Sequence, residues 1–296
     1  MTDIDIRLLT ERDVDAALAL SASCGWNQRA DEWHMMLQIA PAGTFTASTP
    51  DGIVGTAIGI DYGNFGWIAM MLVNPAWRSR GLGARLLEAA MGAIPPELPI
   101  RLDATPLGRP LYERYGFVLE SSLTRHVRPA GAGPPPARSG DVRPLAESDL
   151  AAVMRLDDRI SGAHRQLPLR WAFGDAPRYA WIGESAGASR KAGADADISG
   201  YCLGRGGRLL DHIGPIVAAA TESAADLAAA AIVGSDGRPL VIDAHDSQDA
   251  FVAWLRAAQF EPQRPLYRMW RPGGAPAPSR PAAPLTEFAI MGPEFS

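Results

Sequence analysis

Two stretches of the chain repeat each other in pattern and in order. Residues 6–18 (IRLLTERDVDAAL) align without gaps with residues 142–154 (VRPLAESDLAAVM), and each stretch is typical of a short strand, a turn and a helix with Asp at its start. The segments over residues 117–129 and 260–272 also match, since both run the same length from Phe to Arg-Pro. Matches at both ends of each half indicate a tandem duplication.

The length and the turn-forming residues indicate where the two halves divide. A chain of 296 residues suits two domains of ordinary size. Residues 129–141 (PAGAGPPPARSGD) are rich in Pro and Gly and predict a linker, and residues 185–197 predict a flexible loop. We therefore expect an N-terminal domain over 1–128, a C-terminal domain over 142–272 and a Pro- and Ala-rich tail over 273–296.

Composition excludes several classes of protein. The net charge of −5 argues against a dedicated nucleic-acid binder, which needs a basic surface. The chain shows no signal peptide and no apolar run long enough to cross a membrane, so we expect a cytoplasmic protein without a membrane partner. Cys24 and Cys202 are too few and too far apart for a zinc site, and the histidines lack metal-ligand spacing, so no metal is expected.

The segment that carries chemistry is MLVNPAWRSRGLGARLLEAAM, residues 71–91. A nearly unbroken apolar strand ends at Val73, and Gly81 and Gly83 then open an amphipathic helix. Glycine lets a ligand approach the backbone, and the first N–H groups of a helix have no partner within the helix. This arrangement predicts an anion site. Three arginines add positive charge around it: Arg78, Arg80 and Arg85.

Other phosphate-binding loops fit this segment less well. A Walker A loop needs Lys and then Ser or Thr after its last glycine, whereas Ala84 and Arg85 stand here. A dinucleotide-binding fingerprint needs a third Gly or Ala within a parallel strand–helix–strand unit. The preceding strands are instead typical of a meander with a tight turn between them, at residues 50–52.

The pattern Arg-x-x-Gly-x-Gly at residues 78–83, after a strand that ends Val-x-Pro, resembles the acetyl-CoA pyrophosphate loop of the GCN5-related N-acetyltransferases (the GNAT superfamily). Residues 102–117 (LDATPLGRPLYERYGF) resemble that family's second signature, a strand followed by a short helix that ends Tyr-x-x-x-Gly-Phe. The resemblance covers residues 4–128. It implies an α+β fold with two tandem domains, each a mostly antiparallel twisted sheet flanked by helices.

The second half resembles the degenerate GNAT domains that occur as C-terminal partners in tandem proteins. Aligning the strands before the loop places Glu222 opposite Arg78, and Ala225 and Leu227 opposite the two glycines. A carboxylate in the first turn stabilises a helix but repels a pyrophosphate. We therefore expect this half to keep the fold and to lack the acetyl-CoA site.

The resemblance also implies roles for individual residues in the first half. Tyr112 stands where many members carry a tyrosine that protonates the leaving CoA thiolate, although packing against the pantetheine arm or the core is the alternative for this ring. The backbone N–H near Leu72 is expected to polarise the thioester carbonyl. Acetyl-CoA is expected to contact Met71, Leu72, Val73, Arg78, Ser79, Arg80, Gly81, Leu82, Gly83 and Ala84.

Two parts of the site stay open at this stage. The strand over residues 66–73 carries no acid, so the general base is one of several residues or a water molecule. The amine acceptor is expected near residues that can equally belong to the core. The candidate bases are Glu32, His34, Asp103 and His126, and the candidate acceptor-site residues are Trp26, Asn27, Trp33 and His34.

The resulting hypothesis is an acetyl-CoA-dependent N-acetyltransferase that acts on a primary amine of a small molecule or peptide. The amine would attack the thioester directly in the N-terminal domain. The alternative is a non-catalytic acyl-CoA-binding sensor or partner-binding module. A homo-oligomer is possible under either reading.

Overall fold

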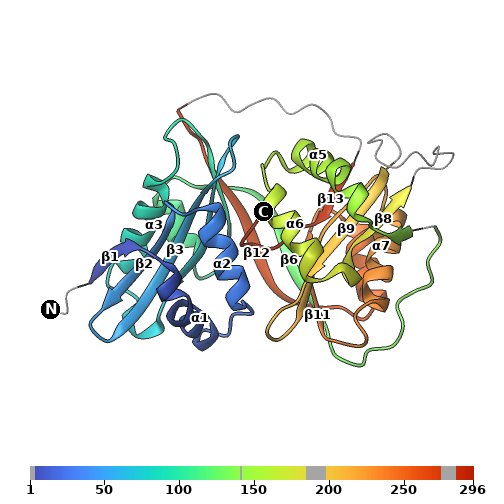
Figure 1. The fold of residues 1–296 in the computed structure, drawn as a ribbon, viewed down its shortest axis with the longest axis horizontal. Helices are drawn as coiled ribbons and strands as arrows, with labels where there is room; N and C mark the ends of the chain where they lie inside the picture. Colours follow the sequence, from blue (N-terminus) through green and yellow to red (C-terminus); the bar gives the residue numbers. More distant parts are fainter. Residues whose placement is uncertain (1–3, 141, 185–197, 275–284) are drawn as a thin grey trace. The chain divides into compact units, whose positions relative to one another are not determined.

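The chain forms two compact units that exchange short segments of sequence. The computed structural model describes residues 4–140, 142–184, 198–274 and 285–296, so the predicted loop over residues 185–197 lies outside the described residues. The first unit contains residues 1–120 and 268–278, and the second contains residues 121–267 and 279–296. Each unit is a sheet with helices packed against it (Figure 1).

The first unit is built around an antiparallel meander. Its sheet has the order β1-β2-β3-β4-β5, and the last residues of β12 lie next to β5. The strands are β1 (Asp5–Leu8), β2 (Thr44–Thr49), β3 (Gly52–Asp61), β4 (Gly66–Val73) and β5 (Ile100–Ala104). The helices are α1 (Val14–Ser23), α2 (Ala30–Ile39), α3 (Leu82–Gly92) and α4 (Arg109–Arg114).

The second unit repeats this order and adds one strand. Its sheet has the order β6-β11-β13-β10-β9-β8-β7. The strands are β6 (Val118–Arg128), β7 (Val142–Pro144), β8 (Trp181–Glu184), β9 (Ile198–Arg205), β10 (Asp211–Ala218), β11 (Leu240–His245), β12 (Glu261–Arg271) and β13 (Thr286–Ala289). The helices are α5 (Leu150–Ser161), α6 (Gln166–Asp175), α7 (Thr221–Val233) and α8 (Asp249–Ala257).

Matching contacts confirm the duplication inferred from sequence. Arg7 donates two hydrogen bonds to Asp13 at 2.8 and 2.7 Å, and Arg143 donates two to Asp149 at 2.6 and 3.1 Å. Each aspartate also accepts a backbone N–H from three residues earlier and so fixes the turn before its helix. The predicted α+β class with mostly antiparallel sheets is confirmed as well.

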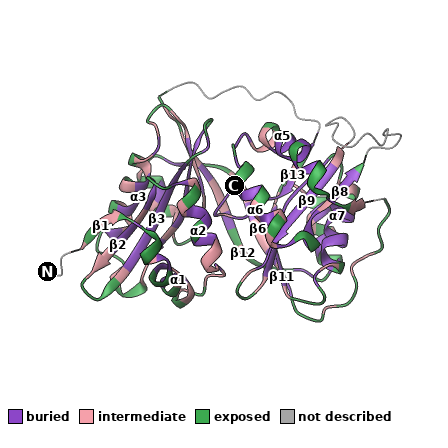
Figure 2. Cartoon of the chain, viewed as in Figure 1, coloured by how far each residue is buried: buried purple, intermediate pink, exposed green. Residues whose placement is uncertain are grey.

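The interior of each unit lies between its sheet and its helices. Figure 2 shows that β3 and β9 are buried over most of their length. Helix α3 is amphipathic, because residues at helical spacing (Leu82, Leu86, Leu87 and Ala90) are buried against the sheet while Arg85 stays exposed. This packing fixes the direction of α3 and therefore the position of the loop that precedes it.

Two features differ from the linear division expected from sequence. The closing strands are exchanged, since residues 123–128 of β6 pair with β11 in the second unit while residues 268–271 of β12 belong to the first. Residues 285–296, which belong to the tail expected from the sequence, contain strand β13 and are mostly buried. Residues 275–284 of that expected tail lie outside the described residues. An alternating or apolar pattern indicates a strand but does not identify its neighbour.

The two central strands of the first unit separate early. Strands β4 and β5 are parallel and pair at only two positions, Gly66 with Ile100 and Trp67 with Arg101. Further along, the pairing of β4 with β3 shifts register opposite Thr56, and Met70 has a positive φ of 50°. The Thr56 hydroxyl donates to the carbonyl oxygen of Met70 at 2.8 Å and so holds this irregularity.

Candidate functional site

The loop between β4 and α3 is exposed and held in shape by its own contacts. Asn74 accepts the backbone N–H of Ala76 at 3.0 Å, and the Arg78 guanidinium donates to the carbonyl oxygen of Val73 at 3.1 Å. Arg80 lies 5.0 Å from the centre of the Trp77 ring. These contacts hold Arg78 at the end of β4 and Arg80 over the Trp77 ring.

The start of α3 offers backbone donors to a ligand. Gly81 has a φ of +78° and precedes the helix as its N-cap, with no side-chain cap. A Cβ added at Gly81 would meet no atom within 4 Å, so the space above this residue is open. In the described chain, the N–H groups of Leu82 and Gly83 have no hydrogen-bond partner. An anion is the ligand that such a helix start favours.

Positive charge surrounds these donors. Arg78, Arg80 and Arg85 are exposed, and Arg85 also donates to the carbonyl oxygen of Ile4 at 3.1 Å. Ser79 has a positive φ of 60°, which turns the chain sharply between the first two arginines. The arrangement fits the pyrophosphate of a nucleotide-like group on three grounds: uncapped N–H groups, glycines without a side chain, and exposed guanidinium groups.

The helix that carries Tyr112 packs against this loop. A Cβ added at Gly83 would lie 3.5 Å from Cδ2 of Leu111 and 3.9 Å from Cγ2 of Val73, so the end of β4, the start of α3 and helix α4 meet at this glycine. Tyr112 follows Leu111 and is 7% exposed. The structure therefore brings Tyr112 and the predicted loop into one region of the first unit.

Burial raises the pKa of Tyr112. Its ring meets Phe117 edge-on with 6.0 Å between ring centres, and desolvation raises the pKa of the phenol well above its usual value. Among the described residues the hydroxyl has no hydrogen-bond partner. The phenol is therefore protonated at neutral pH, and burial makes it a weaker acid than an exposed tyrosine. Tyr115, by contrast, is on the surface and donates to Glu88 at 2.6 Å.

The open side of β4 lies next to the same loop. Leu72 is buried and pairs with Thr56 of β3 on one side. On the other side, no strand among the described residues pairs with β4 beyond Trp67. Backbone groups of residues 68–73 on that side can therefore serve a ligand. Thr56 and Met70 were not predicted as site residues from the sequence. The available signal was the position of Thr56 within a run of small and apolar residues.

The four candidate bases each lie in a different environment. Glu32 accepts the backbone N–H of Arg29 at 2.7 Å and caps α2, while Nδ1 of His34 lies 2.6 Å from the Glu11 carboxylate. The Asp103 carboxylate is bound by Arg268 through two hydrogen bonds. His126 lies in the second unit opposite Ile242, where burial lowers the pKa of its imidazole.

The expected acceptor-site residues lie in different environments. Trp33 is fully buried, whereas the next residue, His34, has a side chain that is 46% exposed. Trp26 and Asn27 are half-buried in the connection between α1 and α2. Trp33 and His34 thus point in different directions, and their roles toward an amine stay predictions.

The second unit has no counterpart of the exposed loop. Strand β10 ends at Ala218 and helix α7 begins at Thr221, so two residues replace the longer connection between β4 and α3. Ala225 and Leu227, which were aligned with the glycines, are buried, and Glu222 lies in the first turn of α7. This connection has neither the glycines nor the arginines of the first unit.

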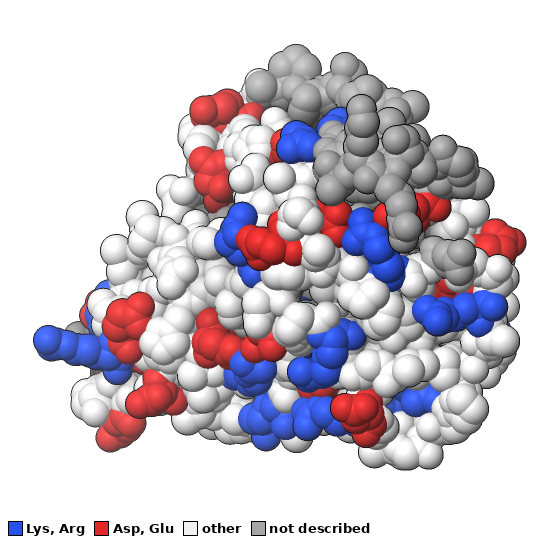
Figure 3. All heavy atoms as spheres, turned by 45° about the vertical axis from the view of Figure 1, so that its right-hand side comes forward, with Lys and Arg blue, Asp and Glu red and all other residues white. Residues whose placement is uncertain are grey.

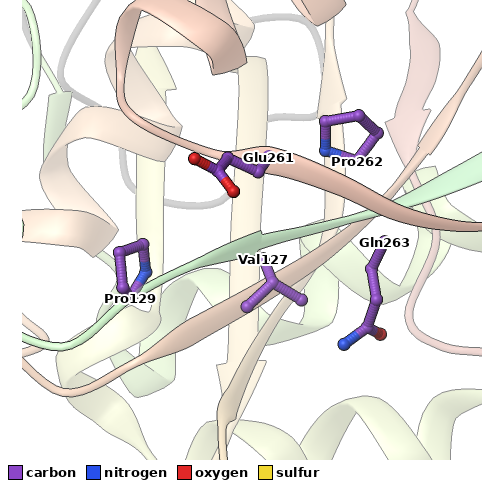
Figure 4. Close-up of a pocket in the computed structure, with 5 residues that line it drawn as sticks. All are labelled: Val127, Pro129, Glu261, Pro262 and Gln263. Carbon is purple, nitrogen blue, oxygen red and sulfur yellow. The ribbon is translucent and has the colours of Figure 1, made fainter.

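A pocket of about 280 Å³ lies elsewhere in the second unit, where the end of β6 and the start of β12 run side by side (Figure 4). It is lined by Val127, Pro129, Glu261, Pro262 and Gln263. None of these is a predicted site residue, and one carboxylate beside one amide does not form a recognisable catalytic set.

On the face drawn in Figure 3, basic side chains lie among acidic ones.

Metal-binding clusters and membrane-spanning helices are both absent from the part of the chain that the structure describes. No group of three or more His, Cys, Asp or Glu side chains in it is placed to hold a metal ion. Every helix in the same ranges is too short or too polar to cross a lipid bilayer.

Comparison with known families identifies the class of protein. A family model described as "Acetyltransferase (GNAT) domain" matches residues 41–119, and a second model with the same description matches residues 153–281. The chain belongs to the GNAT superfamily and carries two of its domains in tandem.

Individual relatives support the same fold. A Bacillus subtilis protein named "Uncharacterized N-acetyltransferase YitH" is 27% identical over 153 residues, which are 49% of this chain and only 54% of that protein. A structure from Pyrococcus horikoshii is 20% identical with a TM-score of 0.75, covering 99% of this chain and 96% of the other. A tandem GNAT protein from the clavulanic acid biosynthesis pathway is 14% identical with a TM-score of 0.59, covering 93% and 100%.

Proposed function

We propose that the first unit binds acetyl-CoA and transfers its acetyl group to a primary amine of a small molecule or peptide. The observation that carries this proposal is the exposed, arginine-rich and uncapped start of α3 beside the open side of β4. In this proposal the domain over residues 1–128 is catalytic, and the C-terminal domain is degenerate.

The loop residues would hold the pyrophosphate. The unpaired N–H groups of Leu82 and Gly83 would donate to it, and the exposed Arg78 and Arg80 would add charge-assisted hydrogen bonds. Gly81 keeps side chains out of the open space at the helix start, and Gly83 leaves room beside Leu111 and Val73. The backbone of Met71, Leu72 and Val73 would bind the pantetheine arm along the open side of β4.

Acetyl-CoA, when bound, supplies an activated thioester. The backbone N–H near Leu72 would donate a hydrogen bond to the oxygen on which negative charge develops during attack. Tyr112 would give its proton to the departing sulfur, since a phenol carries its proton at neutral pH. No candidate base is assigned, and a water molecule would carry the proton away from the amine.

A second candidate is a non-catalytic sensor of acyl-CoA. It is favoured by the positions of the candidate bases, since Glu32, His34 and Asp103 are each held by another partner and His126 lies in the second unit. The sensor would use the same donor loop and differ only in lacking turnover.

The two candidates are separated by thiol release from acetyl-CoA. The full chain is incubated with acetyl-CoA and a panel of amines: amino acids, polyamines, aminoglycosides and peptides with free N-termini. Release that depends on one amine class supports the enzyme. Measurable binding of acetyl-CoA without release for any amine supports the sensor. A chain that does not bind acetyl-CoA contradicts both.

A further inference from the structure

The second unit contains the same opened strand pair as the first, but a third strand occupies it. Strands β10 and β11 are parallel and pair at two positions, Asp211 with Leu240 and His212 with Val241. This matches the two pairs of β4 and β5 at the equivalent ends. Beyond these positions β13 lies between β10 and β11 and is antiparallel to both.

Strand β13 is an addition to the repeated domain. The repeat ends at Arg128 in the first half and at Arg271 in the second, so residues 285–296 lie beyond it. In the first unit, no third strand pairs between β4 and β5 among the described residues. The opening is therefore a property of the fold, and β13 is an occupant of it.

Backbone pairing holds the occupant from both sides. Ala289 pairs with Ile216 of β10 and with Ala244 of β11, and Ile290 donates its N–H to the carbonyl oxygen of Asp243 at 3.0 Å. This is how a sheet receives an added peptide strand. Apolar side chains anchor it, among them Phe288, which is 4% exposed and meets Phe251 edge-on at 5.5 Å, and the fully buried Ile290.

A first carboxylate of the occupant is recognised by basic groups of the domain. Arg165, which is only 1% exposed, donates to Glu287 at 2.9 Å and also to Asp157. The imidazole of His245 lies 3.3 Å from the other oxygen of Glu287. The side chain of Glu287 thus bridges α6 and β11.

A second carboxylate is held further along the segment. Arg205, on β9, donates to Glu294 at 3.2 Å and to the carbonyl oxygen of Met291. The same guanidinium lies 5.3 Å from the ring centre of Phe295. Backbone pairing, apolar anchors and two carboxylates held by buried arginines together form a peptide-recognition set.

We propose that the second unit is a receptor for an extended acidic peptide strand, and that residues 285–296 fill this receptor within the same chain. The recognised chemistry is a short strand with Glu followed by Phe, and then a turn that carries a second Glu seven residues after the first. Since the occupant takes the opening between β10 and β11, the second unit is closed to an acyl donor. This inference does not depend on the activity of the first unit.

The first test makes the receptor vacant in the full chain. The substitutions Phe288→Asp and Ala289→Pro remove one apolar anchor and the central backbone donor of β13. A fluorescent peptide of residues 285–296 should bind this variant one to one and should not bind the unaltered chain. The same peptide with Glu287→Gln or Glu294→Gln should bind at least tenfold more weakly. A variant that keeps its circular dichroism but binds no peptide overturns the proposal.

The second test needs no substitution and covers the case in which that variant does not fold. Native-state hydrogen exchange of the full chain should show the amides of residues 287–290 exchanging through a local opening, before those of β9 and β10. If these amides exchange only when the whole second unit unfolds, the proposal is overturned. Strand β13 would then be an integral strand and not an occupant.

Discussion

The Asp103 carboxylate accepts two hydrogen bonds, at 2.9 and 2.8 Å, from Arg268, which lies 165 residues further along the chain. The second unit repeats the relationship, because Arg125 donates two hydrogen bonds of 2.7 Å to Asp243. In each unit an aspartate on the fifth strand of the repeat is paired with an arginine from the closing strand of the other half. Both aspartate side chains are 0% exposed.

Removing Arg268 should destabilise the chain strongly. The substitution Arg268→Leu takes the guanidinium away from a buried carboxylate, which typically costs about 3–5 kcal/mol. The matched control is Arg109→Leu, which removes the exposed pair with Glu113 and should cost about 0.5 kcal/mol or less. Urea unfolding measures both. Equal effects of the two substitutions would show that the Asp103 pair does not hold the exchanged strand.

Mild acid should destabilise the second unit through His212. This imidazole is buried, and burial together with nearby Arg205 holds its pKa well below the usual value. The unfolded chain takes up a proton below about pH 6.5 and the folded chain does not. Stability is therefore full above about pH 6.5 and falls as the pH drops, by up to about 1.4 kcal/mol per pH unit.

Urea unfolding at pH 7, 6 and 5 tests this expectation. In the variant His212→Asn, the free energy of unfolding should depend less steeply on pH. His126 is also buried with a lowered pKa and should still contribute to the pH dependence that remains. An unchanged slope in His212→Asn would contradict the assignment.

A negative charge at Gly83 should remove donor binding without unfolding the protein. A Cβ there makes ordinary contacts with Leu111 and Val73, so the fold should tolerate Gly83→Glu. The carboxylate would face the pyrophosphate, and a like charge in contact costs several kcal/mol, which is about 100-fold or more in affinity.

The matched control is Gly92→Glu at the other end of the same helix, where a Cβ meets no atom within 4 Å. It should leave affinity for acetyl-CoA within about threefold. Equal affinities of the two variants would refute the loop assignment.

Removing the hydroxyl of Tyr112 should slow the chemical step. If this phenol protonates the thiolate, Tyr112→Phe should lower turnover by about 100-fold with little change in the Michaelis constant for acetyl-CoA. Tyr115→Phe is the control, since that hydroxyl contacts Glu88 on the surface, and it should have no such effect. A packing role for Tyr112 would give the reverse pattern, with weaker affinity and normal turnover.

Local sequence patterns predicted much of the fold. The two matched segments correspond to the strand, turn and helix with their Arg–Asp pairs, and the spacing of Leu82, Leu86 and Leu87 predicted the buried face of α3. The turn after the short helix is also repeated, with positive φ at Gly116 and at Gln259. Each of these features depends on residues that are close together in the sequence.

Features that depend on distant partners could not be predicted in the same way. The pattern of β12 marks a strand, but nothing in it identifies Asp103 as the partner of Arg268. Strand β13 follows a Pro- and Ala-rich stretch that suggested a tail, although residues 287–291 (EFAIM) are compatible with a buried strand. In the site, the loop was predicted from its glycines and arginines. Thr56 was not predicted, because it acts through a hydrogen bond to the backbone of Met70.

Calorimetric titration of the full chain with acetyl-CoA tests the central claim most directly, because the claim assigns the donor site to the first unit and excludes the second. The expected result is one site per chain in the unaltered protein and no measurable binding in Gly83→Glu. Two equivalent sites, or a single site that survives Gly83→Glu, would contradict the account.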